Sequence, residues 1–334
     1  MPEQQRESVA QTDSCHSPGC EVVQPANGCT RRAFVGAAVS GVALTGVGAS
    51  ETAAVASGRA GAKMLWPHLT AERLPQVIEE VGGVCLLPWG CLERHGPHLP
   101  LGTDTIVAEA VASKAAEIEP AVVFPGLIFG QIAGARHCPG TVSLDHELLF
   151  RLLVATLDEI GRSGFTKIVI VNGHGGNNGL LDDLLFSLLQ RRRSYVVYAT
   201  HLSVAEEDRQ RWQQMCPNPG EHAGAEETSC IMYLLPEMVH MEECKDASDG
   251  EPRGMLKQLH GAKNSFWWYA DYPTQLAGDP RSATAEKGRF YLDSCASALA
   301  AQIAQVKADD VSARLAGEFY SAADRGGLPR KHSR

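Results

Sequence analysis

Apolar positions follow two alternating patterns after residue 70, and their order predicts an α/β fold. Short continuous apolar runs, typical of buried strands, lie at 83–88, 121–124, 167–172 and 195–200. Helical patterns occur at 74–81, 106–119, 145–162, 180–193, 204–215, from 221 to Pro236, and at 285–307. Strands and helices in this order predict a three-layer α/β/α arrangement around a mostly parallel central sheet. Residues 240–284 show no clear periodicity.

The first sixty residues differ in character from the rest of the chain. Arg31 and Arg32 precede a Gly/Ala/Val run at 36–48, and a small-residue cleavage site follows at 54–56. This order resembles a twin-arginine export signal, whereas the apolar run is shorter than the ~20 residues of a membrane-spanning helix. We therefore expect an exported protein without a stable membrane anchor, and a cytoplasmic one if the leader is not functional. A disordered tail with two chance arginines is the alternative.

The predicted organisation has three parts: a signal peptide and linker at 1–60, one folded domain at 61–310, and a basic, disordered tail at 311–334. Apolar residues make up 44% of the chain and charged residues 21%, as in ordinary globular proteins. The formal net charge of −9 argues against a nucleic-acid partner. Ten cysteines form no CxxC pair, and the seven beyond the leader are odd in number, which favours buried free thiols over a disulfide framework.

One irregular segment, 88–104, concentrates the side chains that bind metals. Glu93 and His95 are two residues apart, and Asp104 follows nine residues later. The segment comes directly after a predicted strand, where open α/β folds place their sites. Hard and borderline divalent ions prefer this mixture of oxygen and nitrogen ligands. We predict a metal-site loop; the alternative is a polar loop that caps neighbouring elements, with Thr105 or Asp104 as the N-cap of the following helix.

Two further loops carry residues of the same types. His174 lies in a glycine-rich turn after the 167–172 strand, and Glu221, His222 and Glu227 precede or open a predicted helix. The glycine spacing around His174 fits no phosphate-binding motif. A GxSxG serine-hydrolase motif is absent, and a neighbouring carboxylate would raise the pKa of a Cys91 nucleophile. Three loops of deprotonatable side chains predict a metal site.

Five ordered motifs resemble the creatininase (creatinine amidohydrolase) family. The family segment PxGSxEQHGPHLPLxTD is matched by residues 88–104, with Cys91 in place of Ser and Arg94 in place of Gln. The remaining motifs are HxxPGTxSL at 137–144, NGHGGN at 172–177, xHAGxxETS at 221–229, and the blocks 278–281 and 285–288. The similarity covers roughly residues 70–305.

The resemblance implies a centre of two divalent metal ions, zinc or manganese. Glu93 and His95 would bind different ions, Asp104 would bridge them, and His174 would complete the first site. Creatininase itself has a glutamate ligand two residues after this histidine, but Gly176 stands at that position here. We expect Glu227 to replace it.

The other roles implied by the resemblance concern the reaction. His222 resembles the acid/base histidine of the family, and Glu221 is expected to orient it. His137 is expected to line the substrate pocket, with Trp267 and Trp268 as its walls; aromatic core is the alternative for these two tryptophans.

The resulting prediction is a metal-dependent amidohydrolase that cleaves the C–N bond of a small cyclic or linear amide. The resemblance also implies a homo-oligomer, commonly a hexamer. The alternatives within the family are a deformylase, a peptidase and a ring-opening C–C hydrolase. An exported metal-binding protein without catalysis is the alternative from another class. A position of His222 beside the ligands would favour an enzyme.

Overall fold

A four-stranded parallel sheet forms the centre of the molecule. The computed structural model describes residues 64–245 and 247–327, so the predicted leader lies outside the described residues. Strands β1 (Val84–Trp89), β2 (Val122–Val123), β3 (Lys167–Asn172) and β4 (Val196–His201) are arranged in the order β2-β1-β3-β4. All neighbouring strands pair in parallel. The predicted fold class is confirmed, and only the second strand is markedly shorter than expected.

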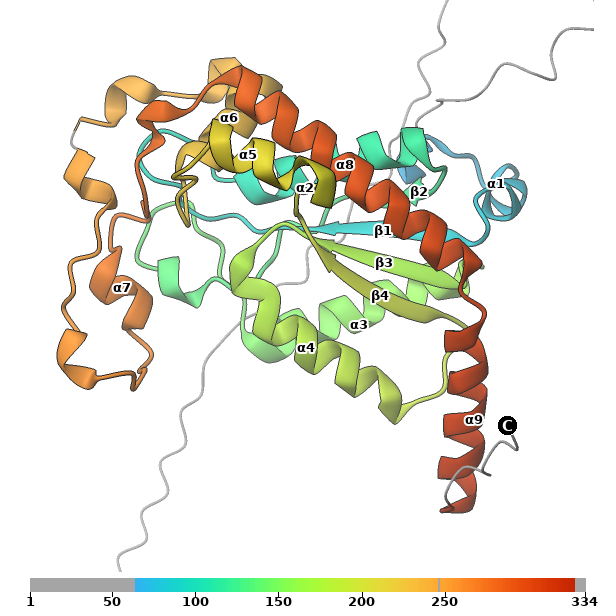
Figure 1. Cartoon of the computed structure of the whole chain (residues 1–334). Coiled ribbons are helices and arrows are strands. Elements are labelled where there is room, and N and C mark those ends of the chain that lie inside the picture. The colour runs from blue at the N-terminus through green and yellow to red at the C-terminus, as the bar shows by residue number, and fades with distance from the viewer. Residues whose placement is uncertain (1–63, 246, 328–334) are drawn as a thin grey trace, which may run out of the picture. The chain divides into compact units, whose positions relative to one another are not determined.

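The path of the chain through the sheet determines which face each helix covers. From β1 the chain moves outward to β2, and it then returns past β1 to reach β3 and β4. Right-handed crossovers in opposite directions place their helices on opposite faces. Accordingly, α2 (Thr103–Ile118) lies on one face, and α3 (His146–Arg162) and α4 (Asn178–Ser187) lie on the other (Figure 1).

The core consists of two apolar layers, one on each face of the sheet. Leu86 and Val169 pack toward α2, α6 (Ala225–Leu234) and α8 (Ala285–Ala308). Leu87 and Ile170 point the other way, toward α3, α4 and α1 (Leu74–Glu80). Because β1 and β3 are buried on both faces, their sequences read as continuous apolar runs rather than as alternating ones.

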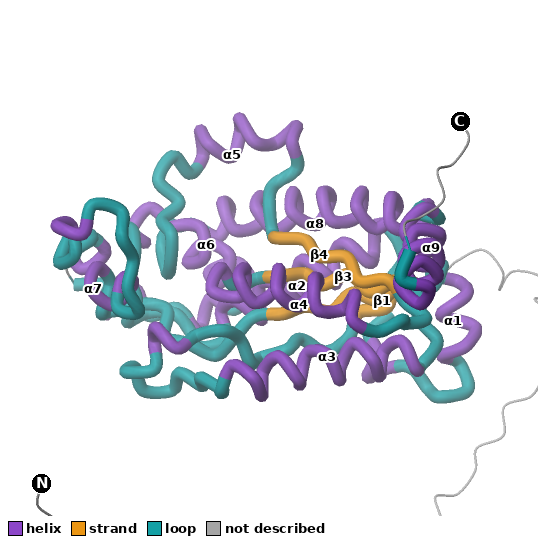
Figure 2. The backbone as a smooth tube through the Cα atoms, turned by 90° about the horizontal axis from the view of Figure 1, so that it is seen from below, coloured by secondary structure: helices purple, strands orange, loops and turns teal. Residues whose placement is uncertain are grey.

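The shorter helices lie around this three-layer body. Helix α5 (Arg209–Met215) precedes α6, and α7 (Trp267–Asp271) interrupts the segment that showed no periodicity. Helix α7 and the last helix, α9 (Val311–Arg325), lie on opposite sides of this body (Figure 1, Figure 2). No helix among residues 64–245 and 247–327 is both long and apolar enough to cross a membrane.

Helix α2 begins earlier than predicted, and this changes the role of Asp104. Its N-cap is Gly102, without a side-chain hydrogen bond, so neither Thr105 nor Asp104 caps the helix. Asp104 instead lies in the first turn, where the positive end of the helix dipole favours a carboxylate. Its side chain is therefore available to the site described below.

The expected disordered tail is wrong for residues 311–325, which form helix α9 (Val311–Arg325). The Asp309 carboxylate accepts the first free N–H groups of this helix, and the Tyr320 hydroxyl donates to the carbonyls of Leu188 and Arg191 at 3.1 and 2.7 Å. The two Tyr320 contacts join residues 132 and 129 positions apart, and local sequence patterns do not reveal contacts over such separations. Residues 328–334 lie outside the description.

The prediction of free thiols is confirmed for the described cysteines. Seven are free, and all but Cys244 are buried.

Candidate metal centre

The candidate site lies where the chain changes direction in the sheet. Trp89 and Asn172, the last residues of β1 and β3, are paired neighbours, and the crossovers that leave these two strands run to opposite sides. Open α/β sheets form their ligand crevice at this position, because the loops diverge there. The loop after β1 supplies Glu93 and His95, and the loop after β3 supplies His174.

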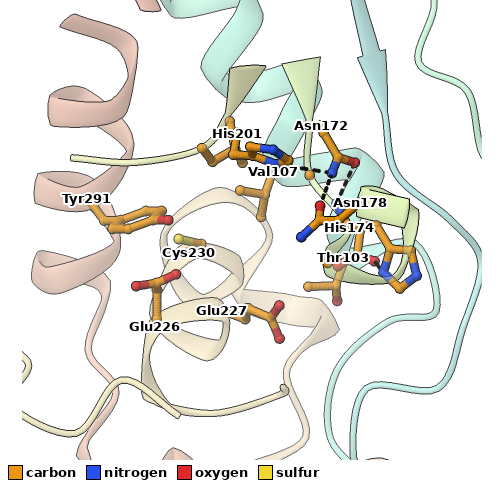
Figure 3. Close-up of a pocket in the computed structure, with 14 residues that line it drawn as sticks. Thr103, Val107, Asn172, His174, Asn178, His201, Glu226, Glu227, Cys230 and Tyr291 are labelled. Atoms are coloured by element: carbon orange, nitrogen blue, oxygen red, sulfur yellow. Dashed lines mark hydrogen bonds and ion pairs between the residues drawn. The ribbon is translucent and has the colours of Figure 1, made fainter. Parts of the chain in front are cut away.

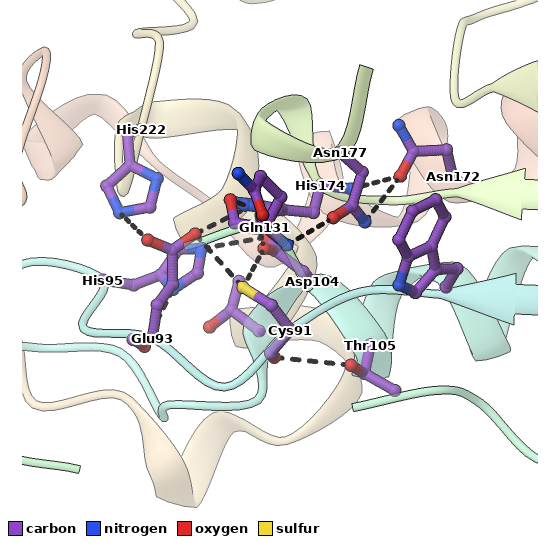
Figure 4. Close-up of polar contacts among 12 residues, drawn as sticks. Cys91, Glu93, His95, Asp104, Thr105, Gln131, Asn172, His174, Asn177 and His222 are labelled. Atoms are coloured by element: carbon purple, nitrogen blue, oxygen red, sulfur yellow. Dashed lines mark hydrogen bonds and ion pairs between the residues drawn. The ribbon is translucent and has the colours of Figure 1, made fainter. Parts of the chain in front are cut away.

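Asp104 lies between two imidazoles and presents one carboxylate oxygen to each (Figure 4). Its Oδ2 is 2.8 Å from Nδ1 of His174, and its Oδ1 is 2.9 Å from Nε2 of His95. Each histidine also has a second carboxylate nearby: Glu93 Oε1 lies 3.0 Å from His174 Nδ1, and Glu227 Oε2 lies 3.7 Å from His95 Nε2. The structure thus brings together all five predicted ligands, with Asp104 at the centre.

Both histidines are held by backbone carbonyls through their other ring nitrogen. Nδ1 of His95 lies 3.3 Å from the carbonyl oxygen of Glu93, and Nε2 of His174 lies 3.3 Å from that of Gln131. A carbonyl oxygen only accepts, so each of these nitrogens donates an N–H. The nitrogen that faces the carboxylates is therefore the one that would give up its proton and bind a cation, as in histidines that bind metals.

The cluster concentrates negative charge in a buried place. Glu93 and Asp104 are 1% and 3% exposed. Burial opposes ionisation of both carboxyl groups, but the neighbouring imidazoles hold the pKa of each below its usual range. Burial likewise opposes a charged His95, but Asp104 and Glu227 raise its pKa to about 10. In the metal-free protein, protons on the imidazoles balance the carboxylates; a bound cation would replace these protons.

The donor atoms fit a pair of divalent cations. Glu93, Asp104 and His174 form one group with Cys91, and His95, Asp104 and Glu227 form a second, with the donor atoms of each group within 4.8 Å of one another. Glu93, His95 and His222 form a third such group. Asp104 belongs to the first two. Carboxylate oxygens with imidazole nitrogens suit zinc and manganese.

Glu227 is oriented by the backbone at the start of α6. Its Oε2 accepts the N–H of Ala223 at 2.6 Å, and its side chain lies in the first turn of the helix. Ala223 has a φ of +53°, in the left-handed region, at the turn that separates His222 from Glu227. The contact fixes the turn before the helix and aims the carboxylate at His95.

Gly176 occupies the position where creatininase has a glutamate, and the structure leaves no room for a side chain there. A Cβ on Gly176 would lie 2.4 Å from His174 Nε2 and 2.6 Å from the Gln131 carbonyl oxygen. The hydrogen bond that fixes His174 thus fills the space that a glutamate would need. The glutamate ligand that the resemblance implies therefore has no place at this position.

The substitution Gly176→Ala is expected to displace His174 from Gln131 and to weaken the first ion site by at least about tenfold in affinity. Metal content after equilibrium dialysis measures this. Gly175→Ala is the matched control, because a Cβ at Gly175 meets nothing within 4 Å. Equal affinity in both variants would contradict the proposed role of the Gln131 contact.

His222 lies beside the cluster, and Arg94 rather than Glu221 orients it. Its Nε2–H donates to the Arg94 carbonyl at 2.9 Å, and its ring centroid is 4.2 Å from that of His95. Glu221 is exposed and lines the neighbouring cavity. Among the contacts of the described residues, none joins the side chains of Glu221 and His222, which corrects the expectation that Glu221 orients this imidazole.

A cavity of about 400 Å³ opens directly onto the cluster. Its lining includes Glu93, Asp104 and His222 as well as Trp267 and Trp268, and the Trp268 ring meets the His222 ring edge-on at 5.9 Å. The structure thus places both tryptophans in the cavity wall and not in the apolar core; Trp267 is 48% exposed. The indole N–H of Trp268 donates to Gln275 Oε1 at 2.9 Å, which holds the ring in place.

His137 does not line this cavity, contrary to expectation. Its Nε2–H donates to the carbonyl of Pro273 at 2.8 Å, and its ring meets the Tyr269 ring edge-on at 4.7 Å. His137 therefore tethers the segment that carries the two tryptophans and acts on the pocket only indirectly.

A second cavity, of about 260 Å³, lies on another side of the same ligands (Figure 3). It shares Asp104, His174 and Glu227 with the first cavity, and the rest of its lining is mixed, with polar residues such as His201 and Glu226 beside apolar ones such as Val107. Burial, with a contribution from Glu227, raises the pKa of Glu226 to about 7. The ligand cluster thus contributes to the walls of two cavities.

Sequence reasoning missed the groups that act through the backbone. The carbonyls of Gln131 and Arg94 orient His174 and His222, and a backbone carbonyl leaves no residue-type signal. It also missed His98, whose Nε2–H donates to Thr228 Oγ1 at 2.8 Å and ties the first loop to α6. Burial and His95 lower the pKa of His98 to about 4, so this histidine stays neutral and its role is structural.

A parallel sheet between two helical layers, with buried carboxylates and imidazoles at its switch point, carries the side chains of a metal-binding site. A family model described as creatinine amidohydrolase matches residues 67–303. The chain therefore belongs to the creatininase family, which confirms the resemblance drawn from its motifs.

The relatives of this chain are named after different substrates. A mycofactocin precursor peptide peptidase of Mycobacterium tuberculosis is 33% identical over 234 residues, which are 66% of this chain and 82% of that protein. Creatinine amidohydrolase of Pseudomonas putida is 28% identical over 240 residues, 65% of this chain and 87% of that enzyme. A solved manganese form of creatininase is 25% identical with a TM-score of 0.63 and covers 73% of this chain and 98% of that one. Another solved creatininase is a zinc-zinc form.

Proposed function

We propose that the protein is a metal-dependent amidohydrolase that cleaves the C–N bond of a small cyclic or linear amide with two divalent ions. The observation that carries this proposal is the position of Asp104, whose two oxygens face two different histidines, each with a second carboxylate beside it. When bound, the two ions supply a hydroxide nucleophile at neutral pH and Lewis acidity toward the carbonyl. No nucleophilic side chain is then needed, in keeping with the raised pKa of the Cys91 thiol, caused by burial and by Asp104 and Glu93.

His222 is the proposed proton donor to the leaving nitrogen. It lies in the cavity wall, its ring beside His95, and the Arg94 carbonyl holds its Nε2–H. A general acid must reach the substrate from such a wall position. A binding protein without catalysis has no need of this group, so its placement favours an enzyme. Trp267 and Trp268 would enclose the apolar part of a small substrate.

Peptide trimming is the second candidate, and a specific observation favours it. The two cavities meet at Asp104, His174 and Glu227, which gives room for an extended chain on both sides of the ligands. The peptidase relative at 33% identity points the same way.

A substrate panel tests the proposal. Protein stripped of metal and then loaded with zinc or manganese would be assayed with lactams, formamides and short peptides, with the stripped protein as control. We expect hydrolysis of one class that disappears on chelation and returns with the ion. Hydrolysis of lactams or formamides supports the first candidate, and hydrolysis of peptides alone supports the second. Loaded protein inactive on all three classes would favour the metal-binding alternative.

A further inference from the structure

The thiol of Cys91 lies inside the first group of candidate ligands. Its Sγ is 3.3 Å from Glu93 Oε1 and 3.2 Å from Asp104 Oδ2 (Figure 4). These are the same two oxygens that contact His174 Nδ1. Sulfur, nitrogen and two oxygens thus converge on one point, within 4.8 Å of one another, and all four residues are buried.

We propose that Cys91 is the fourth protein ligand of the first ion and makes this position a zinc site. The inference rests on the metal centre of the proposed function. Neighbouring ligands around tetrahedral zinc are about 3.3–3.5 Å apart, given Zn–N and Zn–O bonds of about 2.0 Å and Zn–S bonds of about 2.3 Å. The four closest contacts among the donors of this group are 2.8–3.3 Å long in the metal-free protein, so the donors would have to spread only slightly to hold the ion.

The backbone fixes the thiol at this place. A Cβ on the preceding Gly90 would lie 2.4 Å from the backbone nitrogen of Thr105, so the loop packs directly against the first turn of α2. The Thr105 hydroxyl donates to the Cys91 carbonyl at 3.4 Å. Since Asp104 is the neighbour of Thr105 in that turn, Cys91 and Asp104 are held together by the packing of loop against helix.

Ligand chemistry then distinguishes the two ions. Binding at Cys91 replaces the S–H bond by a sulfur–metal bond and releases one proton to solvent, without any change of oxidation state. A thiolate favours zinc, whereas carboxylates and water suit manganese. The first ion would have four protein ligands, as structural zinc sites do, and the second, with His95, Asp104 and Glu227, would keep a position open for chemistry. The serine of the family motif has no comparable preference for zinc.

Cobalt spectroscopy of the full chain tests this inference. Stripped protein titrated with Co²⁺ is expected to develop a near-ultraviolet thiolate-to-cobalt charge-transfer band. Cys91→Ser should still bind cobalt but lack the band, and Cys138→Ser, which removes another buried thiol, should keep it. In competition experiments, the preference of the first site for Zn²⁺ over Mn²⁺ should fall at least about tenfold in Cys91→Ser only.

The outcomes separate this inference from the proposed function. If wild-type protein binds two cobalt ions without a thiolate band, or if Cys91→Ser keeps the band, the Cys91 ligand is overturned and the metal centre stands. If wild-type protein binds no divalent ion, both are overturned. Circular dichroism of each variant establishes that the fold is retained.

Discussion

Asp104→Asn is expected to lose both ions, which is the largest effect of any single substitution in the centre. The amide keeps the shape of the side chain but removes the charge that both ions would share, and its nitrogen replaces one of the two donor oxygens that face His174 and His95. We expect the metal content to fall from about two ions per chain to nearly none, and activity to fall more than about 10²-fold. Elemental analysis after dialysis and the rate on the best panel substrate measure the two effects.

Asp183→Asn provides the control for Asp104→Asn. It makes the same chemical change at an exposed position of α4 and should leave ion content and rate unchanged. Thermal unfolding of both variants separates ion loss from misfolding. Full activity in an Asp104→Asn protein shown to contain no metal would refute the two-ion centre.

Glu227→Gln is expected to remove the second ion and to leave the first in place. The glutamine oxygen can still accept the N–H of Ala223, so the turn before α6 keeps this contact while the negative charge toward His95 is lost. The first group, Glu93, Asp104 and His174 with Cys91, does not contain Glu227. We therefore expect about one ion per chain and a loss of activity of about 10²-fold or more.

Glu226→Gln is the matched control for this variant. Glu226 precedes Glu227 on the same helix turn but belongs to neither ligand group and faces the second cavity. It should keep both ions. If Glu226→Gln loses an ion and Glu227→Gln does not, the second ion is held from the other cavity, and the assignment of Glu227 is wrong.

The order of elements and the position of the site could be predicted from the sequence alone. The runs at 83–88 and 167–172 are apolar throughout because β1 and β3 are covered on both faces, and such strands carry a strong local signal. Polar residues directly after these strands identify the loops of the site, because the ends of parallel strands meet at one edge of the sheet. This pattern identifies Glu93, His95, Asp104 and His174. The family motif then distinguishes the roles expected of them.

Only the tertiary structure decided how these side chains meet. Glu227 lies more than 120 residues from Asp104 in the chain but belongs to the same cluster. This depends on how α6 packs against the first loop, and no local sequence pattern indicates that packing. The physical reason for the absence of a glutamate at Gly176 is the contact of His174 with the Gln131 carbonyl, and these two residues are 43 positions apart in the chain.

Three corrections have the same origin. Arg94 rather than Glu221 orients His222, His137 tethers the tryptophan segment from outside the cavity, and α9 replaces an expected tail. Each depends on contacts between distant segments. The sequence by itself determined the strands, the loops and the kinds of ligand, since these follow from local spacing and residue chemistry. The tertiary structure decided which groups face one another, because hydrogen bonds to backbone carbonyls and close packing are made between segments that the sequence keeps apart.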